Sequence, residues 1–202
     1  HSVNTEHVTV SEGDASGVAM ILVDKAGENS IVVAPGANHK LTTGDIDRAE
    51  PLIKSAAIVV MQLEIPLTVV RHAIATCQRL KVPTILDPAP VPPKGLPRAL
   101  YGVDILSPNQ SEAELLLGLD RVRIKKKRSL DPKQIGSELL SRGPANVLLK
   151  LGPKGALLVS RNLEFRTIRP FKAKVVDTTA AGDAFTGAYA VARSEGLSME
   201  EA

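Results

Sequence analysis

Residues 177–183, DTTAAGD, combine small side chains with two carboxylates near the end of the sequence. Small residues let a backbone come close to a ligand. A helix is predicted from Gly182 to about Glu195, so the N–H groups of Ala181, Gly182 and Asp183 would face outward at its positive end, which suits an anion. Asp183 then has two interpretations: a carboxylate that stabilises its own helix, or a general base beside a phosphoryl group.

Other polar or glycine-rich residues directly follow stretches that are predicted to be strands. In an open parallel sheet, ligands bind outside the carboxyl ends of the strands. A purely structural domain has little reason to place polar residues at all of these ends, so a binding site is predicted there. The residues are Glu64, Asp87, Asn109 and the stretch Lys150–Gly155.

Several of these positions, and the nearby Glu112, also have a structural interpretation. Glu64 could end a strand at the surface, and Asn109 could be a turn residue after a proline. Glu112 could be a first-turn helix charge, and Lys150 could be a solvated strand end. The four histidines do not have the spacing of a zinc ligand set, so no zinc site is predicted.

The first third of the chain predicts β-structure. Residues 6–10 alternate between polar and apolar side chains, and residues 16–24 and 30–34 are two runs joined by turn-forming residues, which predicts an antiparallel hairpin. From Thr42 the pattern changes to helices that alternate with apolar strands. That alternation is typical of βαβ units and a mainly parallel sheet.

The core elements are predicted from the spacing of apolar residues and from capping residues. Strands are expected over 57–64, 84–87, 104–107, 146–151 and 156–160, and helices from 43, over 66–80, over 131–142 and from 182. Ser111 and Glu114 have the spacing of a capping box, with Gly118 as the stop. The predicted fold class is α/β: a mainly parallel sheet flanked by helices (residues 37–202), with a small antiparallel β lid and its connection (residues 1–36).

Composition excludes several classes of protein. The 202 residues are 44% hydrophobic and carry a net charge of +3, which argues against general disorder and gives only a weak field for nucleic acid. Aromatic residues make up 2% of the chain, too few to stack on single strands. The longest apolar run, residues 56–61, is far too short to span a membrane. The lone Cys77 excludes an internal disulfide, and together with the lack of a signal-peptide pattern it predicts a cytoplasmic location, with a plastid or another organelle as the alternative.

The motif DTTAAGDAFTGA (177–188) resembles the C-terminal signature of the ribokinase, or PfkB, family of sugar kinases. Five more segments agree in the same order: PGAN (35–38), MQLE (61–64), DPAP (87–90), PNQSEAE (108–114) and KLGPKG (150–155). The resemblance covers essentially the whole chain. The sequence has no Walker A loop, so a P-loop kinase is excluded.

The resemblance implies a role for each matching residue. Asp183 would be the catalytic base that contacts the sugar hydroxyl, and Glu64 would bind the sugar. The N–H groups of Ala180, Ala181 and Gly182 would stabilise the transferring phosphoryl group. The ATP site would be formed by Asn109, Lys150, Leu151, Gly152, Pro153, Lys154 and Gly155, with Gly182 and Asp183. Asp177 and Thr179 would hold K⁺, and Glu112 would lie in the shell of Mg²⁺.

The resemblance further implies the reaction and the assembly. The expected activity is transfer of the γ-phosphoryl group of ATP to the 5-hydroxymethyl group of D-ribose, with Mg²⁺ and K⁺, in a homodimer formed through the β lid. Sugar and ATP are the expected partners, without nucleic acid or membrane. The family's sugar-binding glycine–lysine–asparagine loop and its adenine pocket are expected outside these residues, in a longer kinase. The alternatives are another kinase of the family, acting on fructose, a deoxysugar or a nucleoside, and a non-catalytic protein that binds a sugar or a nucleotide.

Overall fold

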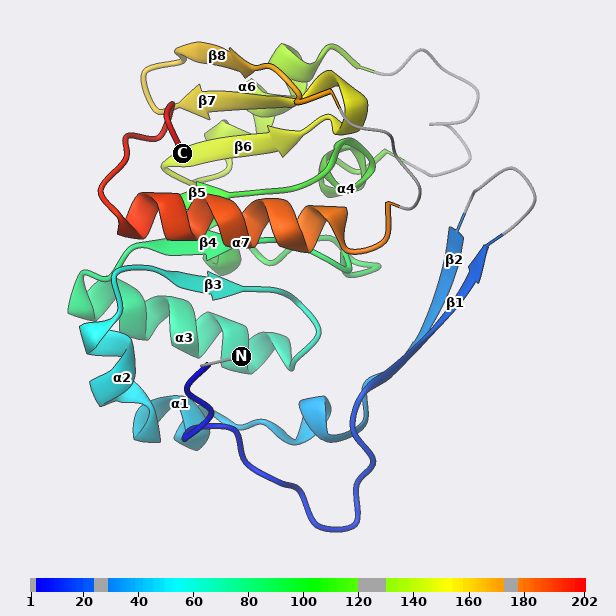
Figure 1. Cartoon of the computed structure of the whole chain (residues 1–202), viewed down its shortest axis with the longest axis vertical. Helices are drawn as coiled ribbons and strands as arrows, with labels where there is room; N and C mark the ends of the chain where they lie inside the picture. Colours follow the sequence, from blue (N-terminus) through cyan, green and yellow to red (C-terminus); the bar gives the residue numbers. More distant parts are fainter. Residues whose placement is uncertain (1–2, 24–28, 120–129, 173–177) are drawn as a thin grey trace.

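The computed structural model describes residues 3–23, 29–119, 130–172 and 178–202. Within them a six-stranded sheet has the order β3-β4-β5-β6-β7-β8, and a separate two-stranded sheet consists of β1 and β2 (Figure 1). Helices cover both faces of the larger sheet. This is the predicted α/β architecture with its small antiparallel sheet.

The strands divide into a parallel part and an antiparallel part. Strands β3 to β6 run parallel to one another, and β7 and β8 continue the sheet with antiparallel pairing. In the small sheet β1 and β2 are antiparallel, with Met20 opposite Val32. The bounds are β1 Val18–Val23, β2 Asn29–Ala34, β3 Val59–Met61, β4 Thr84–Leu86, β5 Ile105–Leu106, β6 Asn146–Lys150, β7 Ala156–Ser160 and β8 Phe165–Ile168.

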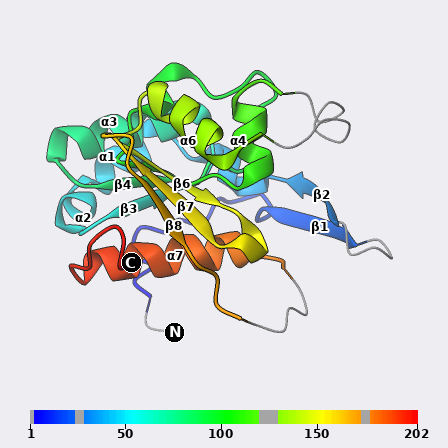
Figure 2. The same cartoon turned by 90° about the horizontal axis from the view of Figure 1, so that it is seen from above.

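The helices form two unequal layers. Figure 2 shows α7 on one face of the sheet and α3, α4 and α6 on the other. The helices are α1 Thr43–Arg48, α2 Glu50–Ser55, α3 Leu67–Leu80, α4 Gln110–Leu116, α6 Pro132–Ser141 and α7 Ala181–Ser194, with 3₁₀ helices η1 Gly36–Lys40, η2 Arg98–Tyr101 and η3 Gly152–Lys154. Among the described residues, no helix combines the length and the apolar character that crossing a bilayer requires.

Apolar side chains on both faces of the strands bury the sheet between these layers. Ile85 packs in a cluster with Tyr189 and Ala190 of α7, whereas the next residue, Leu86, belongs to the larger cluster on the opposite face. Successive strand residues point to opposite faces of a sheet. The near-continuous apolar character of these strands therefore follows from their being covered on both sides.

The structure changes some of the predicted elements. Residues 6–10 form no strand; all of them are exposed, and an extended segment needs a neighbouring strand to satisfy its backbone. The capping box of α4 consists of Asn109 and Glu112, not of Ser111 and Glu114, because the helix begins two residues earlier than predicted. The strand predicted over 57–64 is shortened to β3, and β8 was not predicted.

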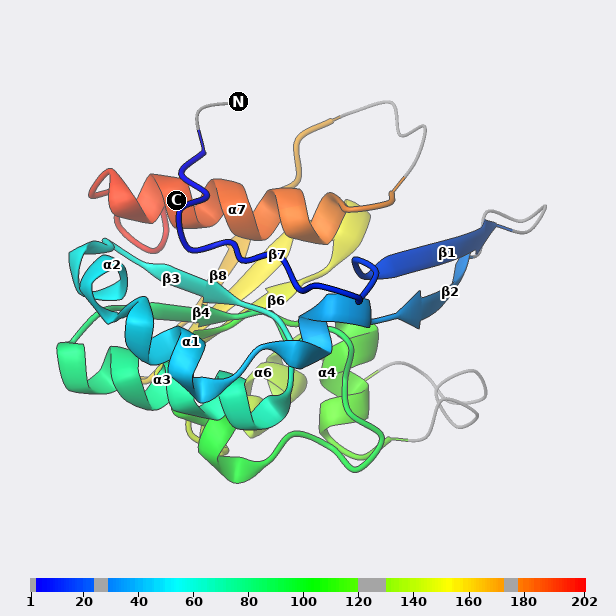
Figure 3. The ribbon, with the colours of Figure 1, turned by 90° about the horizontal axis from the view of Figure 1, so that it is seen from below.

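The small sheet stands beside the edge where chemistry is expected. Figures 1 and 3 both show β1 and β2 projecting on the side of the molecule where β3 and β6 end and α7 begins. The carboxyl ends of the parallel strands, the start of α7 and the small sheet therefore surround the same region.

Candidate active site

The first turn of α7 presents backbone N–H groups to this region. Its N-cap residue, Ala180, has a left-handed backbone (φ 57°, ψ 11°), which costs a residue with a Cβ about 1–2 kcal/mol. The N–H of Ala181 donates to the carbonyl of Thr178 at 3.1 Å. The sequence predicted three outward donors at this turn; because Ala181 turns back to Thr178, the outward donors are the N–H groups of Gly182 and Asp183.

The Asp183 carboxylate is exposed and is held by a residue of the sheet. Gln62, which follows β3, donates a hydrogen bond from Nε2 to Oδ1 of Asp183 at 2.8 Å. One carboxylate oxygen is thereby fixed while the other remains available to accept a proton. From the sequence, Gln62 was recognised only as part of the motif MQLE; its position directly after a strand is the signal that could have identified it.

A buried ion pair lies at the ends of β4 and β6. The ammonium of Lys150 is 2.5 Å from Oδ2 of Asp87, and the hydroxyl of Thr186 in α7 donates to the same oxygen at 3.0 Å. The side chains of Lys150 and Asp87 are only 11% and 4% exposed. The structural alternative for Lys150, a solvated strand end, therefore does not hold. Asp87 was noted only as a residue at a strand end, and Thr186 was not predicted.

Asn109 and Glu112 are bound to each other at the start of α4. The side chain of Asn109 accepts from the Glu112 N–H at 2.8 Å, and the Glu112 carboxylate accepts from the Asn109 N–H at 2.7 Å. A parallel bridge joins Asn109 to Lys150. Burial raises the pKa of Glu112, the bond from the Asn109 N–H and the charge of Lys150 lower it, and the carboxylates of Asp87 and Asp183 raise it. These four charged side chains therefore share one electrostatic environment.

The predicted nucleotide loop is a tight turn between β6 and β7. Gly152, Pro153 and Lys154 form the exposed 3₁₀ helix η3. Gly155 has φ 87° and ψ −134°, and a Cβ there would lie 2.0 Å from the carbonyl oxygen of Ile168. Only glycine fits this position, because both the backbone angles and the space exclude a side chain.

Three further predicted residues are Glu64, Thr179 and Asp177. Glu64 is exposed and lies two residues after Gln62. Thr179 belongs to the turn before α7. Asp177 lies outside the described residues, so the predicted K⁺ pair of Asp177 and Thr179 has only one described member.

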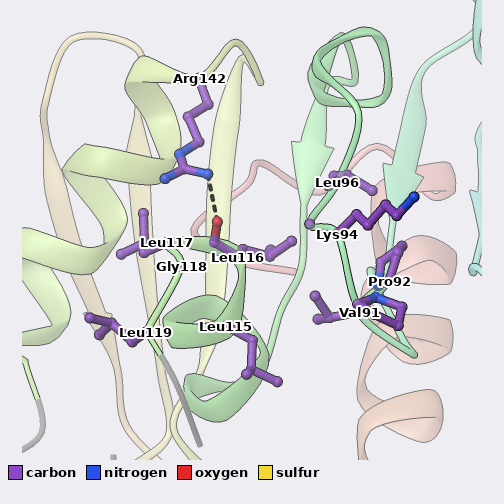
Figure 4. Close-up of a pocket in the computed structure, with 12 residues that line it drawn as sticks. Val91, Pro92, Lys94, Leu96, Leu115, Leu116, Leu117, Gly118, Leu119 and Arg142 are labelled. Carbon is purple, nitrogen blue, oxygen red and sulfur yellow. Dashed lines mark hydrogen bonds between the residues drawn. The ribbon is translucent and has the colours of Figure 1, made fainter. Parts of the chain in front are cut away.

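A pocket of about 770 Å³ lies elsewhere, between the loop after β4 and the C-terminal end of α4 (Figure 4). Arg142 donates a hydrogen bond to the carbonyl of Leu116 at its edge, with a donor–acceptor distance of 2.5 Å. None of the predicted site residues lines this pocket.

The arrangement suits transfer to or from an anion. Two N–H groups at a helix N-terminus and a buried ammonium provide positive charge, and an exposed carboxylate beside them can accept a proton. Within the described part of the chain, no three His, Cys, Asp or Glu side chains are grouped as a metal site. Mg²⁺ needs no such cage, because it keeps several waters and binds through one or two carboxylates and substrate phosphates. Glu112 fits that requirement.

Comparison with known proteins identifies relatives of this chain. The family described as pfkB family carbohydrate kinase matches residues 1–202. The chain is 36% identical to a ribokinase of Haemophilus influenzae, over 99% of this chain and 63% of the relative. It is 34% identical to a deoxyribokinase of Salmonella typhi, over 93% of this chain and 60% of the relative.

A solved structure agrees with both the fold and the family. The structure of Arabidopsis thaliana ribokinase complexed with ribose and ATP superposes with a TM-score of 0.76 at 33% identity, covering 94% of this chain and 60% of that one. The chain thus spans about three fifths of the length of each of these relatives.

Proposed function

Because the chain belongs to the pfkB family of carbohydrate kinases, we propose that the natural-length protein transfers the γ-phosphoryl group of ATP to the 5-hydroxymethyl group of D-ribose. The observation that carries this proposal is the Asp183 carboxylate, exposed in the first turn of α7 and held by Gln62 beside two outward N–H groups. The ribokinase relatives support ribose as the acceptor.

The reaction follows from the groups at this turn. The sugar hydroxyl oxygen attacks the γ-phosphorus, the bond between that phosphorus and the bridging oxygen of ADP breaks, and the hydroxyl proton passes to Asp183. The N–H groups of Gly182 and Asp183 stabilise the negative charge on the transferring group. Gln62 keeps the carboxylate in place, so that little orientation is lost when the hydroxyl arrives.

The nucleotide and its metal ion are assigned to the edge formed by β6, α4 and η3. We assign Asn109, Lys150 and the turn from Leu151 to Gly155 to ATP, and Glu112 to the water shell of Mg²⁺. When bound, Mg²⁺ neutralises phosphate charge. The raised pKa of Glu112 supports a site that gains from a nearby cation.

Potassium is a separate part of the proposal. Thr179, together with Asp177, would hold K⁺ beside the turn that begins α7, and no step above depends on it. Activity is expected to rise with K⁺ and hardly with Na⁺ at matched ionic strength. Equal rates in the two salts would remove K⁺ from the proposal.

The division of the chain into a lid and a core, and its assembly into a dimer, are also proposed. Residues 1–36 would form the lid and its connection, residues 37–202 the kinase core, and the lids of two copies would make a homodimer. Glu64, exposed beyond β3, would contact the sugar beneath the lid.

A cytoplasmic location is proposed, with a plastid or another organelle as the alternative that cell fractionation would distinguish.

A deoxysugar is the second candidate acceptor, because the deoxyribokinase relative is 34% identical to this chain. A phosphorylation assay of the natural-length protein with ribose, deoxyribose, fructose and nucleosides would rank the acceptors by kcat/KM. The highest value is expected with ribose. A protein that binds sugar or ATP without turnover would be the non-catalytic alternative.

The decisive variant is Asp183→Asn. It keeps the size of the side chain but removes the base, so kcat should fall by about 10²–10⁴-fold while ATP still binds. Because Asn is well tolerated near a helix N-terminus, the melting temperature should stay close to that of the wild type. A variant that keeps more than a tenth of the wild-type kcat would show that another group accepts the proton.

A further inference from the structure

The ion pair of Asp87 and Lys150 connects three elements that are distant in the sequence. Asp87 follows β4, Lys150 ends β6, and Thr186 lies in the second turn of α7. Both other side chains meet Asp87 at the same oxygen, Oδ2. The other oxygen, Oδ1, is buried and accepts no hydrogen bond within the described residues. The charge of Asp87 is therefore balanced mainly by one ammonium.

The same ammonium lies close to the first turn of α7, where the phosphate site is predicted. A Cβ placed on Gly182 would be 3.4 Å from Nζ and 4.0 Å from Cε of Lys150, the nearest described atoms outside the local backbone of α7. Gly182 provides one of the two outward N–H groups of α7. A lysine ammonium has three N–H donors, so it can contact Asp87 and a second anion at the same time.

We propose that Asp87 and Thr186 are positioning residues: they hold the Lys150 ammonium beneath the first turn of α7, and this ammonium becomes shared between Asp87 and the phosphoryl oxygens when ATP binds. This inference rests on the kinase function proposed above. In the free protein Asp87 neutralises a buried cation that would otherwise be unpaired, and in the complex the phosphates supply additional negative charge.

The proposal separates two roles that a buried ion pair can have. If the pair only supports the fold, removing either charge is harmful and removing both together restores the protein, because an uncompensated buried charge is the main cost. If Lys150 also acts on the phosphates, removing both charges restores stability but leaves ATP binding weak. The double variant therefore distinguishes the roles.

The test compares single variants of the natural-length protein by melting temperature and by affinity for MgATP. Asp87→Asn should lower the melting temperature and bind MgATP about tenfold more tightly, since the phosphates become the counter-charge of the ammonium. Lys150→Met keeps the length of the side chain without its charge. It should also lower the melting temperature but weaken MgATP binding by at least about tenfold.

The double variant Asp87→Asn with Lys150→Met should regain most of the lost melting temperature and keep the weak MgATP binding of Lys150→Met. Wild-type affinity in the double variant would overturn the proposal. So would single variants that lower the melting temperature equally and bind MgATP like the wild type. Adenosine, which has no phosphate, should bind all of these proteins alike.

Two controls complete the experiment. Thr186→Val, which lacks the hydroxyl, should lower kcat, and Thr186→Ser should restore it; a Thr186→Val enzyme with wild-type kcat would remove Thr186 from the proposal. Glu50→Gln breaks the exposed pair with Arg79; it should leave the affinity for MgATP unchanged and the melting temperature nearly so. A wild-type protein whose melting temperature ignores MgATP, or which phosphorylates no acceptor, would instead overturn the kinase function itself.

Discussion

At the scale of single residues, the site depends on a catalytic base that one element carries and another orients. Asp183 belongs to α7, whereas the group that orients it, Gln62, comes from the end of β3, 121 residues earlier. An amide is a suitable partner, because it donates a hydrogen bond without adding a charge that would compete with the phosphates. The orientation of the base therefore depends on the sheet as well as on the helix.

Gln62→Met tests this orientation. Methionine has a similar length but no N–H donor, so the carboxylate loses a hydrogen bond to a charged group, and kcat should fall about tenfold. The KM for ATP should change little, because Gln62 is assigned no nucleotide contact. In the double variant with Asp183→Asn the two losses should not add, since Gln62 acts through that carboxylate. Additive losses would show that Gln62 acts elsewhere.

Glu112 should make stability depend on pH. Burial raises its pKa above the ordinary value of 4.5 in the folded protein, so the folded state holds the proton more tightly than the unfolded chain does. The stabilising contribution is complete below pH 4.5 and is lost as the pH rises through the folded pKa. Wild-type protein should therefore lose stability relative to Glu112→Gln as the pH rises, measured by urea unfolding between about pH 4 and pH 8.

Glu50 is the matched control for this experiment. Its hydrogen bond with Arg79 lowers its pKa below 4.5, so the sign is reversed and the small difference from Glu50→Gln should be lost as the pH falls. The same slope for both variants would contradict the assignment for Glu112.

At the scale of elements, the turns between strands and helices place the functional groups. The capping box of Asn109 and Glu112 starts α4 beside the end of β6, and η3 turns the chain from β6 into β7. Both turns carry residues assigned to ATP. Their geometry is set by local hydrogen bonds and by glycine, so changes in these turns should affect stability and nucleotide binding together.

Gly155→Ala and Gly152→Ala form a matched pair within η3 and its cap. Both glycines have positive φ, but a Cβ at Gly155 would meet the Ile168 carbonyl, whereas nothing lies within 4 Å of one at Gly152. Gly152→Ala should cost about 1–2 kcal/mol of unfolding free energy. Gly155→Ala should cost more, and chemical denaturation would measure both. Equal costs would mean that the contact with Ile168 relaxes freely.

At the scale of the whole molecule, the two-stranded sheet is the least covered part. Met20 and Val32, which face each other across the hairpin, are 63% and 62% exposed, and other apolar side chains of both strands are also exposed. An isolated hairpin is marginally stable in water, and exposed apolar patches mark interaction sites. This supports the proposal that the lid is covered by a second copy of the protein.

Met20→Glu with Val32→Glu should therefore separate the dimer. The charges would make burial of this surface unfavourable, so light scattering should report half the wild-type mass. The core should melt at nearly the same temperature, because the small sheet shares no strand pairing with the large one. Val8→Glu, at an exposed position outside the two-stranded sheet, is the control and should leave the mass unchanged. An unchanged mass in the lid variant would locate any dimer contact elsewhere.

The sequence by itself determined the class of fold and the segment that carries the chemistry. Helix α3 and the hairpin were predicted closely, because apolar period and turn residues are local properties of the chain. The start of α7 was recognisable for the same reason, since small residues and a carboxylate stand together in DTTAAGD. The cap of α4 was placed two residues late, because two overlapping pairs of residues have the spacing of a capping box.

Only the tertiary structure decided which side chains meet. Asp87 lies 63 residues before Lys150 and 99 before Thr186, and Gln62 lies 121 residues before Asp183. No periodicity or spacing connects positions so far apart, because their contact depends on strand order and on where α7 crosses the sheet. From the sequence alone, Lys150 could equally have been a solvated strand end. In the structure it is a buried partner of Asp87, because parallel strands bring their carboxyl ends to one edge of the sheet, next to the start of a helix.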